Sequence, residues 1–173
     1  MDLISGCLLT LRTWPWHIYV VDKLQPTVLL TLEFEVANGQ KWNRGVAGNS
    51  YSSSDRFSLL VQSHEECWLL IVALDQEGIY PVYREEDGTP AAYRFPYLNK
   101  PYRIEFDHGG ALGMQYYFAI ASPTKFNYQS MIRPHIENLL VNKNLSVKGA
   151  AIPYQLPLKD RFSQRLVYFD IPR

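Results

Sequence analysis

One alternating stretch of sequence decides the fold of this chain: VLLTLEFEV, residues 28–36. In an extended strand, side chains alternate between two faces. The even-numbered apolar residues from Leu30 to Val36 therefore point one way, and the odd-numbered polar residues from Thr31 to Glu35 point the other. This period of two is typical of a strand with one face in a core and the other in water.

Other stretches along the chain are rich in β-branched and aromatic residues and are predicted to be strands as well. They are residues 16–21, 57–62, 67–74, 79–83, 102–106, 115–121 and 166–171. The apolar run 67–74 is typical of a central strand covered on both faces. We expect it to form hairpins with residues 57–62 and 79–83, and residues 102–106 to pair with 115–121 across a glycine-rich bend. Residues 43–55 and 84–99 are expected to be loops.

Residues 127–141 have the apolar spacing of a helix, with Asn127 as a possible N-cap. Pro134 is awkward inside a helix because it lacks a backbone N–H, so the helix either begins near Ile132 or is kinked. The predicted fold class is mostly β: an antiparallel β-sandwich with one C-terminal helix. We expect a single domain over 1–173, with an N-terminal strand region (1–27), a β core (28–126), and a helix with a C-terminal extension (127–173).

Composition restricts the possible functions. The 17 basic and 17 acidic side chains cancel, so no strong net field attracts nucleic acid, and we expect none to bind. No apolar run approaches the roughly 20 residues of a transmembrane helix. The two cysteines and four histidines are scattered, and we predict no metal and no cofactor.

Three passages resemble an uncharacterised bacterial domain family that occurs in envelope lipoproteins or fused to protein kinases and caspase-like peptidases. They are the loop from Gly39 to Asp55 with the strand that follows, residues 67–81, and residues 102–123 with their glycine cluster. The resemblance covers residues 28–126 and implies a small β-sandwich. It supplies no catalytic residues, and the stretches before and after it depart from the family's pattern.

Four aromatic residues are the candidate binding residues. Two indoles flank a proline in Trp14-Pro15-Trp16, and Trp42 and Tyr51 border the polar loop. Aromatic faces held on β scaffolds commonly anchor sugars, peptides or proteins. Ordinary packing at a sandwich edge is the alternative for these rings.

Catalysis is the competing class of function. Cys67 follows His64 by three residues, and His108 precedes two glycines, so a small cysteine hydrolase using Cys67 with His64 or His108 is possible. The favoured interpretation of Cys67 is structural: a buried, inert thiol at the start of a core strand. Because the sequence assembles no further catalytic set, we predict that the chain is not an enzyme.

The segment Ile4-Ser5-Gly6-Cys7 resembles a bacterial lipoprotein cleavage site, which makes Cys7 a candidate for lipidation, although the preceding residues lack the features of a signal peptide. We therefore expect a non-catalytic binding or scaffolding domain of the bacterial cell envelope that recognises a protein or glycan partner. A cytoplasmic protein and a carbohydrate-binding module are the alternatives.

Overall fold

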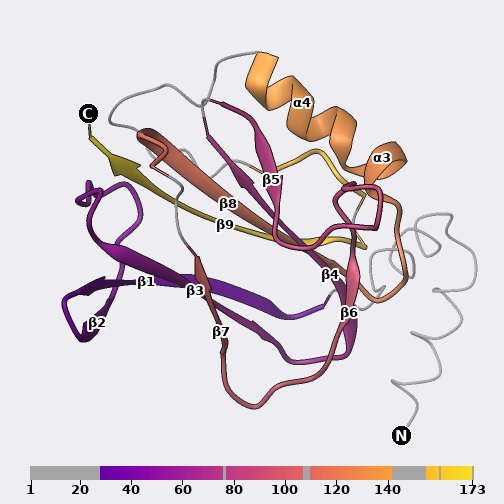
Figure 1. Cartoon of the computed structure of the whole chain (residues 1–173). Helices are drawn as coiled ribbons and strands as arrows, with labels where there is room; N and C mark the ends of the chain where they lie inside the picture. Colours follow the sequence, from indigo (N-terminus) through magenta and orange to yellow (C-terminus); the bar gives the residue numbers. More distant parts are fainter. Residues whose placement is uncertain (1–27, 76, 107–109, 142–154, 160, 173) are drawn as a thin grey trace, which may run out of the picture.

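The computed structural model describes residues 28–75, 77–106, 110–141, 155–159 and 161–172. Over this part, the chain forms two facing antiparallel sheets with two short helices beyond one of them (Figure 1). The predicted class, a mostly β antiparallel sandwich, is confirmed.

The four-stranded sheet has the strand order β2-β1-β3-β7, which are Lys41–Arg44, Leu30–Asn38, Arg56–Ser63 and Tyr102–Phe106. The five-stranded sheet has the order β5-β4-β8-β9, which are Ile79–Pro81, Cys67–Leu74, Gly113–Ser122 and Ser163–Ile171. Its fifth strand, β6 (Tyr93–Phe95), pairs with β4 beside β5.

Alternation in β1 produces the inner face of the four-stranded sheet. The apolar side chains at the even positions from Leu30 to Val36 are buried, whereas Thr31, Glu33 and Glu35 are half-buried on the outer face. The expectation drawn from residues 28–36 is confirmed. Residues on the same face of the neighbouring strand β3, including Leu59 and Val61, belong to the same core.

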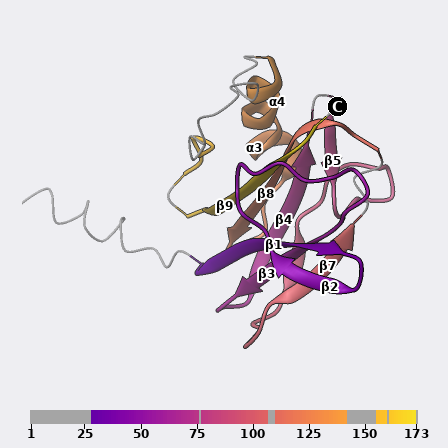
Figure 2. The ribbon, with the colours of Figure 1, turned by 90° about the vertical axis from the view of Figure 1, so that its left-hand side faces the viewer.

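The five-stranded sheet is apolar on both faces because it separates two cores. In β4, Leu69 and Ile71 face the four-stranded sheet, whereas Leu70 and Val72 pack toward the helices. The prediction that residues 67–74 form a central strand covered on both faces is confirmed. Figure 2 shows the resulting order of layers: helices, five-stranded sheet, four-stranded sheet.

The predicted hairpin between residues 57–62 and 67–74 is wrong, because β3 and β4 lie in different sheets. The polar connection at His64–Glu66 instead crosses the sandwich, and the His64 amide donates to the carbonyl of Leu29, just before β1, at 3.1 Å. Crossing lets the apolar faces of β3 and β4 meet inside one core instead of lying side by side.

The predicted pairing of residues 102–106 with 115–121 is also wrong. β7 pairs with β3, and β8 pairs with β4 and β9. β8 is buried along most of its length and requires neighbours on both sides, whereas β7 is a short strand with exposed residues at the end of its sheet.

The single predicted helix is replaced by two: α3 (Tyr128–Met131) and α4 (Arg133–Val141). Asn127 caps α3 as predicted, its side-chain oxygen accepting a hydrogen bond from the Ser130 amide at 3.0 Å. Pro134 explains the break because its ring replaces the amide that one continuous helix would need there. In α4 it occupies the first turn, where that amide has no partner.

Two short strands were not predicted. β2 lies at the start of the stretch expected to be a loop (43–55), and β6 lies within the expected connection 84–99. The last strand, β9, begins at Ser163, earlier than the predicted 166. The strand predicted at residues 16–21 lies outside the described residues.

One side of the sandwich is closed by backbone hydrogen bonds, and we call it the closed edge. The loop after β2 crosses to β9, where the Tyr51 amide donates to the Asp170 carbonyl (2.8 Å) and the Asp170 amide to the Asn49 carbonyl (2.9 Å) (Figures 1 and 2). Gly48, at φ +81°, donates to the Tyr168 carbonyl at 3.0 Å. A loop thus covers part of the outer edge of β9.

Candidate binding site at the open edge

The opposite side of the sandwich, which we call the open edge, is formed by β7 of one sheet and by β5 and β6 of the other. Strand register places Tyr102 and Ile104 of β7 beside buried residues of β3 on the inner face. Tyr80 of β5 lies opposite Ala73, and Tyr93 of β6 lies opposite Leu69, again on the inner face. The end strands of both sheets therefore direct inner-face rings toward this opening.

Tyrosines dominate this edge. Tyr80, Tyr83 and Tyr102 are 40%, 49% and 54% exposed, and Tyr97, in the loop between β6 and β7, is 59% exposed. Together with the half-buried Tyr93, they form what we call the tyrosine edge. These five are among the twelve tyrosines of the chain and come from one stretch of sequence, 80–102.

Ring contacts link the tyrosine edge to the core. Tyr83 and Tyr93 lie 4.0 Å apart between ring centres, Tyr93 and Phe95 6.1 Å, and Phe95 and Tyr102 6.5 Å. Burial, with Tyr83 and Tyr102 nearby, raises the pKa of Tyr93 well above the usual value for a phenol. Its hydroxyl therefore stays protonated at neutral pH. The half-buried Tyr93 thus supports the exposed ring of Tyr83, and the buried Phe95 supports that of Tyr102.

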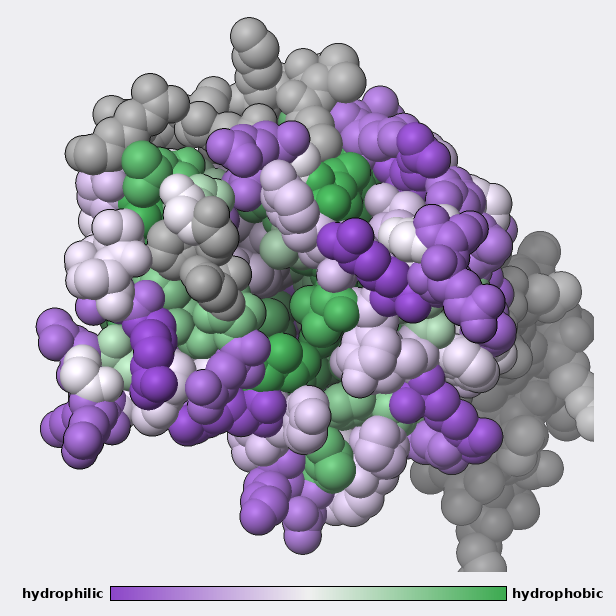
Figure 3. Space-filling view, in the orientation of Figure 1, coloured by the Kyte–Doolittle hydropathy of each residue, from purple (hydrophilic) through white to green (hydrophobic). Residues whose placement is uncertain are grey.

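Viewed face on in Figure 3, this edge has hydrophobic residues in the middle and hydrophilic ones around them. The apolar members include Val82, which is 37% exposed, and the half-buried Ile104 and Phe106. Tyrosine rings add contact area that is apolar on the ring and polar at the hydroxyl. This combination of side chains is typical of a surface that binds another macromolecule.

An acidic hairpin stands beside the tyrosine edge, between β5 and β6. The Ala91 amide donates to the Tyr83 carbonyl at 3.1 Å, and the Glu85 amide to the Thr89 carbonyl at 2.7 Å. The tip carries Glu85, Glu86 and Asp87, all exposed. The Thr89 amide donates to Asp87 at 2.8 Å and lowers the pKa of that carboxyl, which stays ionised at neutral pH.

Trp42, one of the predicted binding residues, lies on the outer face of the four-stranded sheet. The guanidinium carbons of Arg56 and Arg103 lie 5.2 and 4.9 Å from its ring centre. Arg103 also pairs with Glu35 at 2.5 Å. The indole is half-buried under these contacts, so its faces are already engaged with cations of the chain itself.

Tyr51, the second described candidate, packs into the core instead of facing a partner. Its ring lies 5.8 Å from Phe34, 6.0 Å from Phe57 and 5.9 Å from Phe169, edge-on in each case. Its hydroxyl accepts a hydrogen bond from the Val46 amide at 2.7 Å. The structure therefore does not bring Trp42 and Tyr51 into one site. Trp14, Trp16 and Cys7 lie outside the described residues.

Cys67, the candidate nucleophile, is buried at the start of β4. Its thiol donates to the Ser63 hydroxyl at 3.5 Å, and burial raises its pKa. A catalytic cysteine requires the opposite shift, since the thiolate is the nucleophile. His64 is exposed in the crossing connection, and His108 lies outside the described residues.

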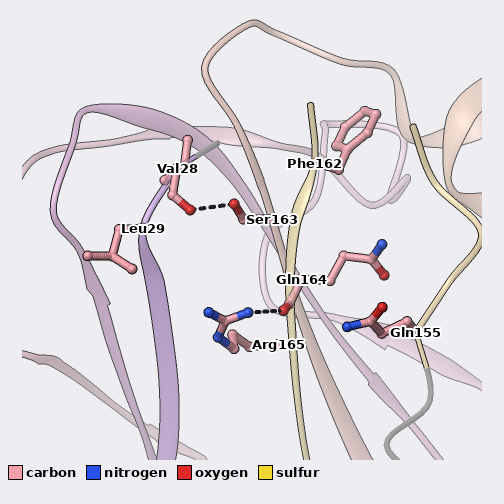
Figure 4. A pocket seen from close by; sticks show the side chains of 7 residues that line it. All are labelled: Val28, Leu29, Gln155, Phe162, Ser163, Gln164 and Arg165. Carbon is pink, nitrogen blue, oxygen red and sulfur yellow. Dashed lines mark hydrogen bonds between the residues drawn. The ribbon is translucent and has the colours of Figure 1, made fainter. Parts of the chain in front are cut away.

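A cavity of about 280 Å³ lies beside the start of β9 (Figure 4). It is lined by Val28, Leu29, Gln155 and residues 162–165. Two of its polar side chains bond to nearby backbone: Ser163 donates to the Val28 carbonyl, and the Gln164 amide group bonds to both backbone groups of Leu156 at 2.9 Å. These two side chains hold the chain segments together.

Within the described ranges, no group of three or more His, Cys, Asp or Glu side chains could hold a metal ion. Nor does any helix there have the length and apolarity to cross a membrane. Comparison with known proteins gives no match to a family model, to a curated protein or to a solved structure. The resemblance to the envelope family therefore stays a prediction.

The tyrosine edge was missed by the sequence reasoning, although a signal for it existed. The stretch 80–102 holds five tyrosines and four prolines, at positions 81, 90, 96 and 101. Proline is confined to edge strands and loops of sheets, so tyrosines interleaved with proline indicate rings at an edge. Ring type and loop position, the two features that Trp14, Trp16, Trp42 and Tyr51 share, do not distinguish a binding ring from a packed one.

Proposed function

We propose that this protein is a non-catalytic binding domain that recognises a protein partner through the tyrosine edge. The observation that carries the proposal is the exposure of Tyr80, Tyr83, Tyr97 and Tyr102 where the sandwich opens. Tyrosine supplies large contact area at little loss of side-chain entropy, and it is enriched in binding surfaces. Paired strands carry Tyr80 (β5) and Tyr102 (β7), and the ring of Tyr83 contacts Tyr93, so these three rings are positioned before a partner arrives.

The electrostatics of Cys67 support a binding function over the cysteine hydrolase. Desolvation holds its proton on the thiol. Alkylation with iodoacetamide tests this alternative: we expect Cys67 to react only as the protein unfolds. Rapid alkylation of the folded protein near neutral pH would revive the hydrolase.

The carbohydrate-binding alternative depends on free indole faces. The arginines over Trp42 argue against sugar stacking there, and Lys125 lies 5.1 Å from the ring centre of Trp68. Tryptophan fluorescence titrated with oligosaccharides should therefore not shift. A saturable shift that disappears in Trp42→Ala would favour the glycan instead.

The location in the bacterial cell envelope is part of the proposal and rests on the resemblance and on the pattern ending at Cys7. Both concern sequence, and Cys7 lies outside the described residues. Labelling of bacteria with a radioactive fatty acid tests lipidation, with Cys7→Ser as the control. Label that is absent, or that persists in Cys7→Ser, would contradict an anchor at this residue.

Selection of random displayed peptides on the intact protein tests the protein-binding proposal. We expect selected peptides to bind at least about tenfold more weakly to the double variant Tyr83→Ser, Tyr102→Ser, because two anchors are lost. Val46→Ser is a matched control, since Val46 is 56% exposed on the closed edge. Failure to select peptides, or peptides that bind both variants equally well, would overturn the proposal.

A further inference from the structure

We propose that a second copy of this chain binds at the open edge, through antiparallel pairing of β7 with the β7 of the other copy. The inference rests on the proposed function, because β7 carries Tyr102 of the tyrosine edge, and it names the partner. Paired in this way, the two four-stranded sheets become one continuous sheet across a two-fold axis.

Among the sheet ends of the described strands, β7 is the best suited to pair with its own copy. It has no neighbouring strand on one side in the described part of the chain, and it contains no proline. At the other ends, β9 is partly covered by the Tyr51 loop, and β5 contains Pro81, which lacks an amide. β2 carries two cations, Lys41 and Arg44, and no carboxylate, so two copies of it bring only like charges together.

The backbone of β7 directs alternate residues toward the open side. On β3, the Ser63 carbonyl accepts from the Leu98 amide, in the connection to β7, at 3.2 Å. Odd-numbered residues of β3 therefore bond toward β7, where they lie opposite its even-numbered residues. Successive residues of a strand bond to opposite sides, so the amides and carbonyls of Arg103 and Glu105 point away from the sheet.

The sequence of β7, Tyr-Arg-Ile-Glu-Phe, is complementary to itself when two copies run antiparallel. With the two-fold axis at Ile104, Arg103 lies opposite Glu105 of the second copy, and Tyr102 lies opposite Phe106. Because Arg103 and Glu105 have the outward backbone groups, each such pair also exchanges two backbone hydrogen bonds. A shift of the register by two residues places Arg103 opposite Arg103, or Glu105 opposite Glu105, and the like charges repel.

The side chains of β7 suit this pairing on both faces of the sheet. On the outer face, Arg103 is held by Glu35 at 2.5 Å and lies over Trp42, 4.9 Å from the ring centre. Its guanidinium is therefore already ordered, and it keeps further N–H donors for a second carboxylate. On the inner face, the exposed Tyr102 and the half-buried Phe106 gain ring contacts across the two strands.

The charge of the open edge is balanced, which permits two copies to approach each other. Between residues 79 and 106 there are four cationic and four anionic side chains. The copies meet without net repulsion, and the Arg103–Glu105 pairs select one register. A strand of 5 residues gives a small interface, so we expect a dissociation constant of about 10 to 500 µM. At the lower concentrations used for unfolding experiments the chain is then a monomer.

Sedimentation equilibrium of the intact protein, from about 5 to about 500 µM, measures the dimer. We expect Glu105→Arg to weaken it at least about tenfold, because two cations then lie opposite each other. Arg103→Glu should weaken it in the same way by opposing two carboxylates. An equimolar mixture of the two variants should dimerise about as well as the original chain, since every pair again joins opposite charges.

The matched control is Glu137→Arg, which makes the same change of net charge as Glu105→Arg. Glu137 lies on α4, beyond the five-stranded sheet and away from β7 (Figure 2). This variant should change the dissociation constant less than about twofold. Circular dichroism checks that each variant is folded.

Hydrogen exchange followed by NMR locates the contact without any variant. The Arg103 and Glu105 amides point to the open side, whereas those of Tyr102, Ile104 and Phe106 bond to β3. Raising the protein concentration should therefore protect the Arg103 and Glu105 amides and leave the other three unchanged. This pattern tests the pairing even if Arg103→Glu, which loses contacts within its own chain, does not fold.

A protein that stays monomeric at about 500 µM, equal weakening by Glu105→Arg and Glu137→Arg, or a mixture of folded variants that fails to dimerise would overturn the inference. The displayed-peptide selection distinguishes this failure from failure of the proposed function. A monomeric protein whose selected peptides need Tyr83 and Tyr102 would refute the second copy and retain the binding domain. A monomeric protein that selects no such peptides would refute both.

Discussion

Tyrosine side chains are packed into the core at the closed edge of the sandwich and exposed at the open edge. At the closed edge, Tyr51 inserts among Phe34, Phe57 and Phe169, and the loop that carries it bonds to β9. At the open edge, Tyr83 and Tyr102 remain about half exposed at 49% and 54%. Exposed rings add little to stability, so the difference separates rings that hold the fold together from rings available to a partner.

The largest effect is expected from Phe169→Ala at the closed edge. Phe169 is fully buried and stacks on Phe57 at 4.6 Å and on Phe34 at 5.0 Å. Removing such a ring should lower the free energy of unfolding by about 3–5 kcal/mol through lost transfer energy and the cavity left behind. Urea denaturation measures it. A loss below about 1 kcal/mol would show that these rings do not form the core.

High pH tests two tyrosines on the inner face of the five-stranded sheet, Tyr117 of β8 and Tyr93 of the tyrosine edge. Burial raises the pKa of Tyr117 and Tyr93 above their unfolded value near 10. Folding thus disfavours phenolate, so the stability contribution is complete below pH about 10 and is lost as pH rises above it. Absorbance near 295 nm should show these two ionising only as circular dichroism reports unfolding.

The matched variant for the pH experiment is Tyr93→Phe, which removes the ionising hydroxyl and keeps the ring. It should move alkaline unfolding to higher pH. Reversible ionisation of every tyrosine near pH 10 in protein that remains folded would contradict the burial of Tyr93 and Tyr117.

A smaller effect is expected from Tyr51→Phe. This change keeps the ring contacts with the core and removes the hydroxyl that accepts from the Val46 amide and donates to its carbonyl at 3.3 Å. The free energy of unfolding should fall by about 1 kcal/mol, the usual net contribution of such hydrogen bonds. Unchanged stability in thermal unfolding would mean that water replaces the hydroxyl at no cost, and that the ring alone fixes the loop.

The sequence predicted strands better than it predicted their partners. Residues 67–74 were placed correctly because an apolar run is a local signal, and β4 occupies that range. The connection at His64–Glu66 was assigned to a hairpin because a short polar segment suits a hairpin and a crossing between sheets equally well. Which of them forms depends on the faces that meet in the core, and these come from residues far apart in sequence.

The candidate site was harder to predict than the fold for a related reason. Tyr51 and Tyr102 have the same side chain, and both adjoin polar sequence, yet one is packed in the core and the other is exposed. Their difference arises from position: the Tyr51 loop reaches β9, whereas β7 ends its sheet. Exposure at an edge follows from strand order. The prolines within 80–102 mark edge strands and loops, but they do not specify which sheet or which end of it these occupy.

The smallest effect on stability is expected at the open edge, and it is the result on which the comparison depends most. Tyr102→Ser should change the free energy of unfolding by no more than about 0.5 kcal/mol, since a half-exposed ring contributes little packing. Equilibrium urea unfolding beside Val46→Ser measures this. A loss above about 1.5 kcal/mol would place Tyr102 among the structural rings. The rings of the open edge would then serve to stabilise the fold, as those of the closed edge do, and the proposal of a partner there would lose its basis.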